Sequence, residues 1–94
     1  MNIIKFNNVE FEVIGYNKNT YFSDDTITST ASCQIIVADM EVLNSLTKTA
    51  ITSLQILHDG NIIYNLSDIS AHIDNISEYL NVDKMDINVS LRFD

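Results

Sequence analysis

Histidine and cysteine, which often serve in catalysis and as ligands of transition metals, are rare in this sequence. The chain has two histidines, His58 and His72, and one cysteine, Cys33. A metal site needs several such ligands close together, and a nucleophilic cysteine needs a base and an oxyanion site. His58 beside Asp59 is typical of a solvated turn, and His72 flanks an apolar stretch. We therefore expect no catalytic residue, no metal site and no cofactor.

Phosphate-binding and calcium-binding patterns are weak as well. Gly15 and Gly60 are the only glycines, whereas a phosphate-cradling loop needs several before a helix. Some carboxylates fall near expected turns without the spacing of an EF-hand loop, so solvated loop acids are the better interpretation. These acids are Asp24, Asp25, Asp59, Asp83 and Asp86.

Composition predicts one globular domain over residues 1–94. The chain is 46% apolar and only 19% charged, whereas a disordered chain has few apolar and many charged residues. A chain this short buries only about 60 to 65% of its surface on folding, so stability can depend on a partner or on self-association. The single cysteine excludes an internal disulfide.

A formal net charge of -8 disfavours direct contact with nucleic acid or an anionic membrane and permits a basic partner. The acids are scattered, which is typical of a solvated surface. The first residues lack the pattern of a signal peptide, and no apolar run reaches the roughly 18 residues of a membrane span. We therefore expect no secretion by a signal peptide and no membrane partner.

The N-terminal residues predict a hairpin. Residues 3–6 and 9–14 form its strands, and Asn7 and Asn8 form a tight turn. This register places Phe6 opposite Val9, with an apolar face on one side of the ribbon. Ile4 then faces Phe11, and Lys5 faces Glu10.

Residues 15–25 are expected to form a long loop. They set Tyr16, Tyr21 and Phe22 among polar residues. Loops of this length are often functional or packed on themselves. Either Tyr16 and Phe22 fold back as a lid on the core, or the aromatic side chains are exposed anchors for a partner.

Residues 26–38 carry no charge until Asp39 and predict a long strand, with Ile27, Ala31, Cys33, Ile35 and Val37 on one face. Edge strands usually carry charges or proline that block pairing with another chain. This strand has neither. It is therefore central in the sheet or covered by another subunit.

A short helix should follow Asp39 as N-cap, with Met40, Leu43 and Leu46 at helical spacing. Residues 50–58 then predict a strand. Asp59 and Gly60 predict a two-residue hairpin turn into a return strand at 61–66. With that turn, Ile56 pairs with Ile63, and Leu57 pairs with Ile62.

Residues 67–80 predict the main amphipathic helix, capped by Ser67. Its apolar stripe is formed by Ile69, Ile73, Ile76 and Leu80. Residues 81–84 break this pattern.

Residues 85–94 alternate apolar and polar side chains, from Met85 to Phe93 on the apolar face, and predict a closing strand.

Together these elements predict an α+β fold. A largely antiparallel sheet would begin with the N-terminal hairpin and continue in the order β-α-β-β-α-β. The alternative is a β-sandwich or open barrel with one principal helix.

The opening hairpin, residues 51–64 and residues 87–93, with abundant Ile and Asn, resemble small virion-associated proteins of tailed phages. The resemblance implies a small β-rich subunit, similar to tail or connector proteins, that extends its sheet into neighbouring copies. It also implies a location in the virion or the host cytoplasm. Our leading hypothesis is a non-enzymatic structural or assembly subunit whose partners are itself or other virion proteins.

Two other functions remain open. The charge of -8 suits a small acidic inhibitor that blocks a basic site on a host nucleic-acid enzyme. A small-molecule binding module or enzyme would need a deep pocket with converging polar groups. The residues we expect to bind a partner come from the aromatic loop and the uncharged strand. They are Tyr16, Tyr21, Phe22, Asp24, Asp25, Thr28, Thr30 and Ser32.

Overall fold

Strands dominate the protein. The computed structural model describes residues 1–80 and 85–94. Over these residues 69% of the chain is strand and 8% is helix, so the fold is mostly β. The elements are β1 (Asn2–Phe6), β2 (Val9–Ser23), β3 (Thr26–Ile36), α1 (Met40–Leu46), β4 (Leu54–His58), β5 (Asn61–Leu66), β6 (Ala71–Leu80) and β7 (Met85–Phe93). The predicted α+β class with β-α-β-β-α-β order is therefore wrong.

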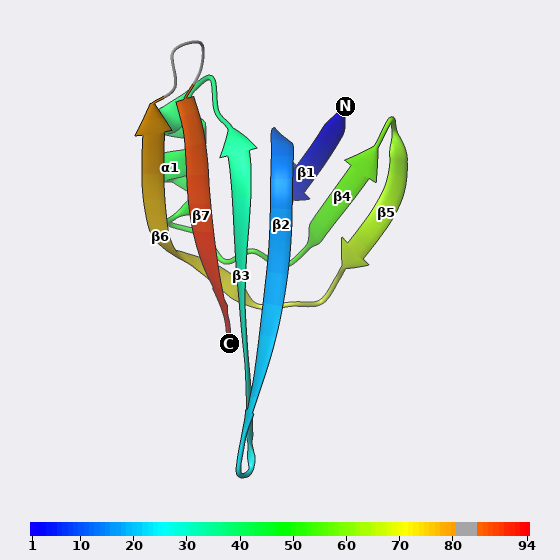
Figure 1. Ribbon diagram of the computed structural model, residues 1–94, viewed down its shortest axis with the longest axis vertical. Helices are drawn as coiled ribbons and strands as arrows, with labels where there is room; N and C mark the ends of the chain where they lie inside the picture. The colour runs from blue at the N-terminus through cyan, green and yellow to red at the C-terminus, as the bar shows by residue number, and fades with distance from the viewer. Residues whose placement is uncertain (81–84) are drawn as a thin grey trace.

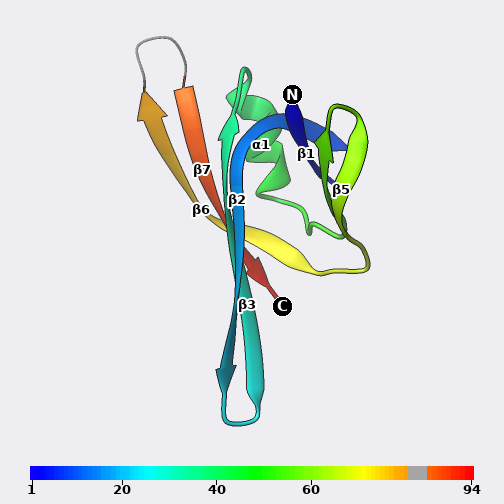
Figure 2. The same ribbon diagram turned by 45° about the vertical axis from the view of Figure 1, so that its right-hand side comes forward.

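The strands of the described residues form one seven-stranded sheet in the order β5-β4-β1-β2-β3-β7-β6. Every neighbouring pair in it is antiparallel. The sheet curves, and α1 lies against one of its faces (Figures 1 and 2). From these views the two long strands β2 and β3 extend well beyond the rest of the molecule.

The predicted main helix at residues 67–80 is wrong, because β6 occupies most of that range and pairs with β7. A β-bulge explains the misleading pattern. The register shifts between Ile73 and Asn75, so Ile73 lies opposite Leu91 and Ile76 lies opposite Val89. One extra residue puts side chains three positions apart on the same face of a strand, which imitates helical spacing. The alternative of a sandwich or open barrel assumed the same helix and is wrong on this point too.

The short helix α1 forms as predicted. Asp39 caps it, since its Oδ1 accepts a hydrogen bond from the Glu41 backbone nitrogen at 3.0 Å. Leu43 and Leu46 are buried, and Met40 packs against the core cluster. Because a helix of two turns is marginal by itself, this packing is what holds it.

The predicted loop at residues 15–25 is also wrong. Strand β2 continues to Ser23, and the reversal is made by Asp24, whose φ is +48°, and Asp25. Strand β3 then pairs back along β2, with Phe22 opposite Ile27. Tyr, Thr and Phe favour extended backbone, and no glycine or proline interrupts residues 16–23.

Both predicted hairpins are present. The first has the expected pairs, Phe6 with Val9, Ile4 with Phe11 and Lys5 with Glu10. In the second, Asp59 and Gly60 both have positive φ, and Leu57 pairs with Ile62 as expected.

The predicted pair of Ile56 with Ile63 is wrong, since a register shift places Tyr64 opposite Ile56. The strand expected over residues 50–58 begins only at Leu54, and Ile51 makes an isolated bridge. The break expected at 81–84 lies outside the described residues.

From Thr30 to Ile36 strand β3 is central, between β2 and β7, which confirms for this part the first of the two expectations; Thr26 to Ser29 pair with β2 alone. Ala31, Cys33 and Ile35 on its predicted apolar face are buried. Ile27 on the same face is 70% exposed, because it lies beyond the end of β7.

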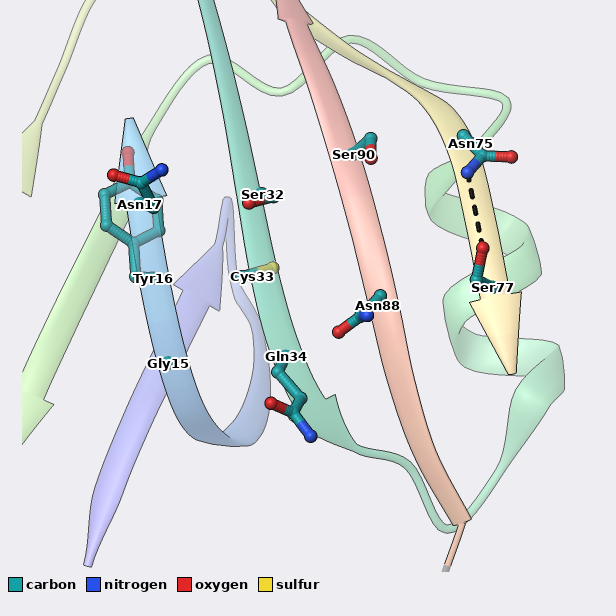
Figure 3. A pocket seen from close by; sticks show the side chains of 10 residues that line it. All are labelled: Gly15, Tyr16, Asn17, Ser32, Cys33, Gln34, Asn75, Ser77, Asn88 and Ser90. Atoms are coloured by element: carbon teal, nitrogen blue, oxygen red, sulfur yellow. Dashed lines mark hydrogen bonds between the residues drawn. The ribbon is translucent and has the colours of Figure 1, made fainter. Parts of the chain in front are cut away.

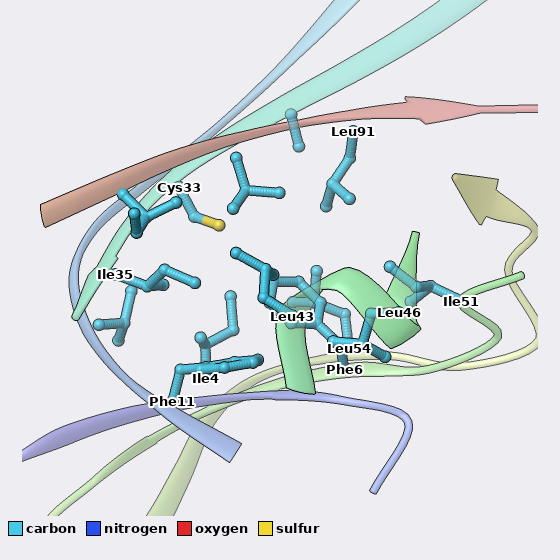
Figure 4. Packing of buried hydrophobic residues seen from close by; sticks show 14 of the residues in the cluster. Ile4, Phe6, Phe11, Cys33, Ile35, Leu43, Leu46, Ile51, Leu54 and Leu91 are labelled. Atoms are coloured by element: carbon cyan, nitrogen blue, oxygen red, sulfur yellow. The ribbon is translucent and has the colours of Figure 1, made fainter. Parts of the chain in front are cut away.

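The core lies between the curved sheet and α1 (Figure 4). The closing strand β7 contributes three of its most deeply buried side chains, Ile87, Val89 and Leu91, as its alternation predicts. The other fully buried large side chains come from β1, β3, α1, residue 51 and β4. They are Phe6, Ile4, Ile35, Leu43, Ile51 and Leu54.

Asn7 ties the first hairpin to the segment before β4. Its φ is +57°, and its Oδ1 accepts hydrogen bonds from the Thr52 nitrogen at 2.9 Å and from the Thr52 hydroxyl at 3.2 Å. The Ser53 nitrogen donates to the same oxygen at 3.3 Å, and Asn7 Nδ2 donates to the Ala50 carbonyl at 3.2 Å. This segment in turn bonds to the start of β6, because Ile51 and Ala71 exchange two backbone hydrogen bonds.

We predict that Asn7→Ala lowers the free energy of unfolding by about 1 to 3 kcal/mol. Each hydrogen bond contributes about 0.5 to 1.5 kcal/mol, but three of the four share Oδ1 and most are exposed, so water replaces part of what is lost. Urea unfolding followed by circular dichroism measures the change. The matched control is Asn8→Ala in the same turn, whose exposed side chain makes no described hydrogen bond. We expect it to cost less than about 0.5 kcal/mol. Equal losses in the two variants would contradict the role of the Asn7 side chain.

Candidate functional site

The most conspicuous surface feature is the hairpin formed by the distal parts of β2 and β3. We call residues 20–29 the arm. Pairing of β2 with β1 ends at Glu12, and pairing of β3 with β7 begins only at Thr30. Within the arm each strand therefore pairs only with the other, and Figure 1 shows it extending away from the body of the sheet.

The two faces of the arm differ. Phe22 and Ile27 face each other across the strands on the side that continues from the core, and they are 77% and 70% exposed. Behind them the hydroxyls of Thr20 and Ser29 lie 3.3 Å apart. The opposite face carries Tyr21. An apolar pair at the end of a projecting ribbon is the arrangement expected of a contact surface.

The eight residues predicted to bind a partner do not form one cluster. Tyr21, Phe22, Asp24, Asp25 and Thr28 lie on the arm, with the two aspartates at its turn. Thr30, Ser32 and Tyr16 lie on the same strands nearer the body.

Neither residue forms the lid of one interpretation, because both lie on the paired strand β2, where Tyr16 packs against the core and Phe22 is exposed. The Tyr16 and Tyr64 rings pack with centroids 5.2 Å apart, and the Tyr16 hydroxyl donates to the Tyr64 hydroxyl at 3.4 Å. Burial, followed by this hydrogen bond, raises the pKa of Tyr16 well above its usual value. Its phenol therefore stays neutral and serves packing.

Two open edges of the sheet offer backbone groups for further pairing. Strands β5 and β6 are the edge strands of the described sheet. Strand β5 has no charged residue, and its Ile62 and Ile63 are 58% and 63% exposed. Charges and proline usually protect such edges, and β5 lacks both.

A shallow pocket of about 400 Å³ lies across β2, β3, β7 and β6 (Figure 3). Cross-strand register orders its side chains into rows. Asn17, Ser32, Ser90 and Asn75 form one row across the four strands, and Gly15, Gln34, Asn88 and Ser77 form the next. Tyr16 and Cys33 complete the described lining. We call this surface the polar pocket.

None of the described lining residues of the polar pocket is charged. Within it Asn75 Nδ2 donates to the Ser77 hydroxyl at 3.4 Å, and Gln34 Nε2 donates to Asp86 Oδ2 at 3.5 Å, just outside. The side-chain amides of Asn17 and Asn88 and the hydroxyls of Ser32 and Ser90 have no hydrogen bond to another described residue, so they can meet a ligand or water. The Tyr16 hydroxyl is already bonded to Tyr64.

Our sequence predictions included Tyr16 and Ser32 from this pocket but missed the rest. A signal was available in the sequence: Gln34 on β3 and Asn88 and Ser90 on β7 are polar but uncharged, and each stands between apolar neighbours in its own strand.

The histidines lie apart and pair with nearby carboxylates or amides. His72 Nδ1 is 2.9 Å from Asp94 Oδ2, and His58 Nδ1 is 2.6 Å from Asn2 Oδ1. Over residues 1–80 and 85–94 no group of three or more His, Cys, Asp or Glu side chains is arranged to hold a metal ion. No helix in those ranges has the length and hydropathy needed to cross a membrane.

Comparison with models of known protein families finds no match to the chain. Comparisons with curated proteins and with solved structures find no match either. Any functional proposal therefore depends on the residues and geometry described above.

We predict that Cys33 reacts slowly with a thiol-specific disulfide reagent at pH 8. Burial raises its pKa to about 12, so little thiolate is present. Absorbance of the released thiolate measures the rate, which should rise sharply in urea. The control places a thiol at the exposed neighbour by Ser32→Cys in a Cys33→Ala background, and it should react rapidly in the native state. Prompt labelling of native Cys33 would contradict its burial.

Proposed function

We propose that this protein is a non-enzymatic structural or assembly subunit that associates with further copies of itself through the arm. The observation that carries the proposal is the pair Phe22 and Ile27, exposed on a ribbon beside which no other described strand pairs. Soluble monomers rarely place large apolar side chains together at such a position.

Among the described residues the arm has neither a third strand nor a covering layer. A two-stranded ribbon is at best marginally stable in water, and three strands or a covering layer are normally needed. Burying a Phe or Ile side chain contributes about 1.5 to 3 kcal/mol each. A neighbouring subunit that covers Phe22 and Ile27 would supply this burial and hold the arm in place.

The open backbone edges support the same function. Along the arm the outer edges of both strands are unpaired in the described structure, and β5 presents another uncharged edge. An added strand would bond to these groups through its main chain and obtain register from alternate side chains. Strand addition of this kind agrees with what the sequence resemblance implies, namely a sheet that extends into neighbouring copies.

A phage particle is the assembly we propose, and the support for that part is the resemblance of the sequence to small virion proteins. The acidic side chains give the inhibitor hypothesis little support. They are distributed over separate elements, with Asp24 and Asp25 at the end of the arm, Glu10 and Glu12 on β2, and Asp59 at the β4–β5 turn. A blocker of a basic site would instead gather them on one surface.

We predict that the double variant Phe22→Ser with Ile27→Ser loses self-association while keeping its fold. Both side chains are exposed, so their removal takes no contact from the core. Sedimentation velocity over a wide concentration range should show oligomers for the natural sequence and a monomer for the variant. Circular dichroism should be the same for both.

The matched control is Val42→Ser, which removes an apolar side chain 40% exposed on α1, away from the arm. It should assemble like the natural sequence. A natural chain that stays monomeric at every concentration would refute the proposal, as would undiminished assembly of the double variant.

A further inference from the structure

We propose that the polar pocket binds a neutral saccharide, a function separate from the assembly role of the arm. Its described lining combines amides, hydroxyls and one glycine without any charge, on a protein whose net charge is -8. Thirteen acidic residues belong to the chain, yet the described lining contains none of them. The chemistry of this surface is therefore that of neutral hydrogen bonding.

The side chains match the groups that sugars offer. A sugar hydroxyl donates one hydrogen bond and accepts others, and it is best met by groups that can do both. Asn and Gln amides present a carbonyl acceptor beside an NH₂ donor, and serine hydroxyls serve in either role. Asn17, Gln34 and Asn88 supply amides from three adjacent strands, and Ser32 and Ser90 lie between them.

Exposed tyrosines flank this polar surface at two ends. Tyr21 lies on β2 at the same side-chain parity as Asn17, and Tyr79 lies on β6 at the same parity as Ser77. Their exposed fractions are 57% and 55%. With a rise of about 3.3 Å per residue, Tyr21 lies roughly 13 Å beyond Asn17, and Tyr79 lies roughly 7 Å beyond Ser77. Flat aromatic rings stack on the C–H faces of sugar rings, so the tyrosines would extend the site along an oligosaccharide.

Other ligands fit this surface less well. A phosphate, sulfate or nucleic acid requires Arg or Lys. On this face the described basic residue nearest to the pocket in strand register is Arg92. Its Nε lies 3.6 Å from Asp94 Oδ1. A second protein sheet packed face to face requires interdigitating apolar side chains, and the pocket rows have none. The Asp86 carboxylate borders the lining, where it is buried and accepts a hydrogen bond from Gln34, and its charge would repel an anion. The uncharged lining therefore favours a neutral, hydroxyl-rich ligand.

Gly15 keeps the pocket open. It pairs with Gln34, so a Cβ there would point to the same face, and it would meet no atom within 4 Å. Its φ is outside the positive range that disfavours side chains. Gly15→Val should therefore fold normally, gain strand propensity and fill the space beside Gln34.

The test is native affinity electrophoresis in gels containing dextran, starch, laminarin or mannan. We expect at least one of these neutral polysaccharides to retard the natural protein, equally at low and high salt. Gly15→Val should abolish the retardation. Asn88→Ala should weaken binding about two- to tenfold, the effect of one lost hydrogen bond. Asn8→Ala, in the distant first turn, is the matched control and should bind normally.

The proposal is overturned if none of the four polysaccharides retards the protein, if retention disappears in salt, or if Gly15→Val binds as well as the natural sequence. Phe22→Ser with Ile27→Ser should still bind the saccharide, because the arm is a separate surface. If that variant fails to assemble but binds the saccharide normally, both proposals are supported independently.

Discussion

The fold depends on how Asn7 closes the sheet. A residue with φ of +57° makes the first turn, and the same side chain receives hydrogen bonds from Thr52 and Ser53. Residues 50–53 are thereby fixed between the first hairpin and the start of β6, where Ile51 bonds to Ala71. The two ends of a seven-stranded sheet are brought round one core by this connection. Asparagine suits it because it tolerates left-handed backbone and offers both an acceptor and a donor.

Closure of this kind explains where α1 lies. The helix is too short to be stable alone, and its Leu43 and Leu46 become part of the core because residues 50–53 carry the chain directly back to the sheet. Ile51, at the centre of that return, has no exposed surface. The helix, the return segment and β4 therefore depend on one another. A defect at Asn7 would be transmitted to all three.

Sequence patterns predicted the elements that local chemistry determines. Asp59 and Gly60 have the backbone conformation that a two-residue turn requires, and Asp39 caps α1. The apolar positions of β7 are buried as its alternation indicates, but Asp86 on the expected solvent face is only 6% exposed. Sequence patterns failed at β-bulges, which depend on pairing with a distant strand. The extra residue between Ile73 and Asn75 made β6 look helical, and the shift after Ile56 moved Tyr64 into the position expected for Ile63.

In the candidate site, too, local sequence indicates some features, whereas others depend on pairing with distant strands. Exposed aromatic side chains were one of two interpretations of residues 15–25, because Tyr21 and Phe22 stand among polar residues, but the paired arm that carries them was not predicted. The polar pocket was not predicted either, because it exists only when Asn17, Gln34, Asn88 and Asn75 are placed in register across four strands. Its open space also depends on the bulge between Val13 and Gly15 and on the missing side chain of Gly15.

The faces of the β2–β3 ribbon make the two proposed contacts compatible. Phe22 and Ile27 continue the core side of the sheet, whereas Tyr21, Asn17 and the pocket rows occupy the opposite side. A neighbour that covers the apolar face of the arm would leave the polar face open to solvent. Repeated copies joined in this way would present many such pockets. Weak binding of one saccharide unit per pocket would then add to a much stronger attachment, because linked sites raise the effective concentration at one another.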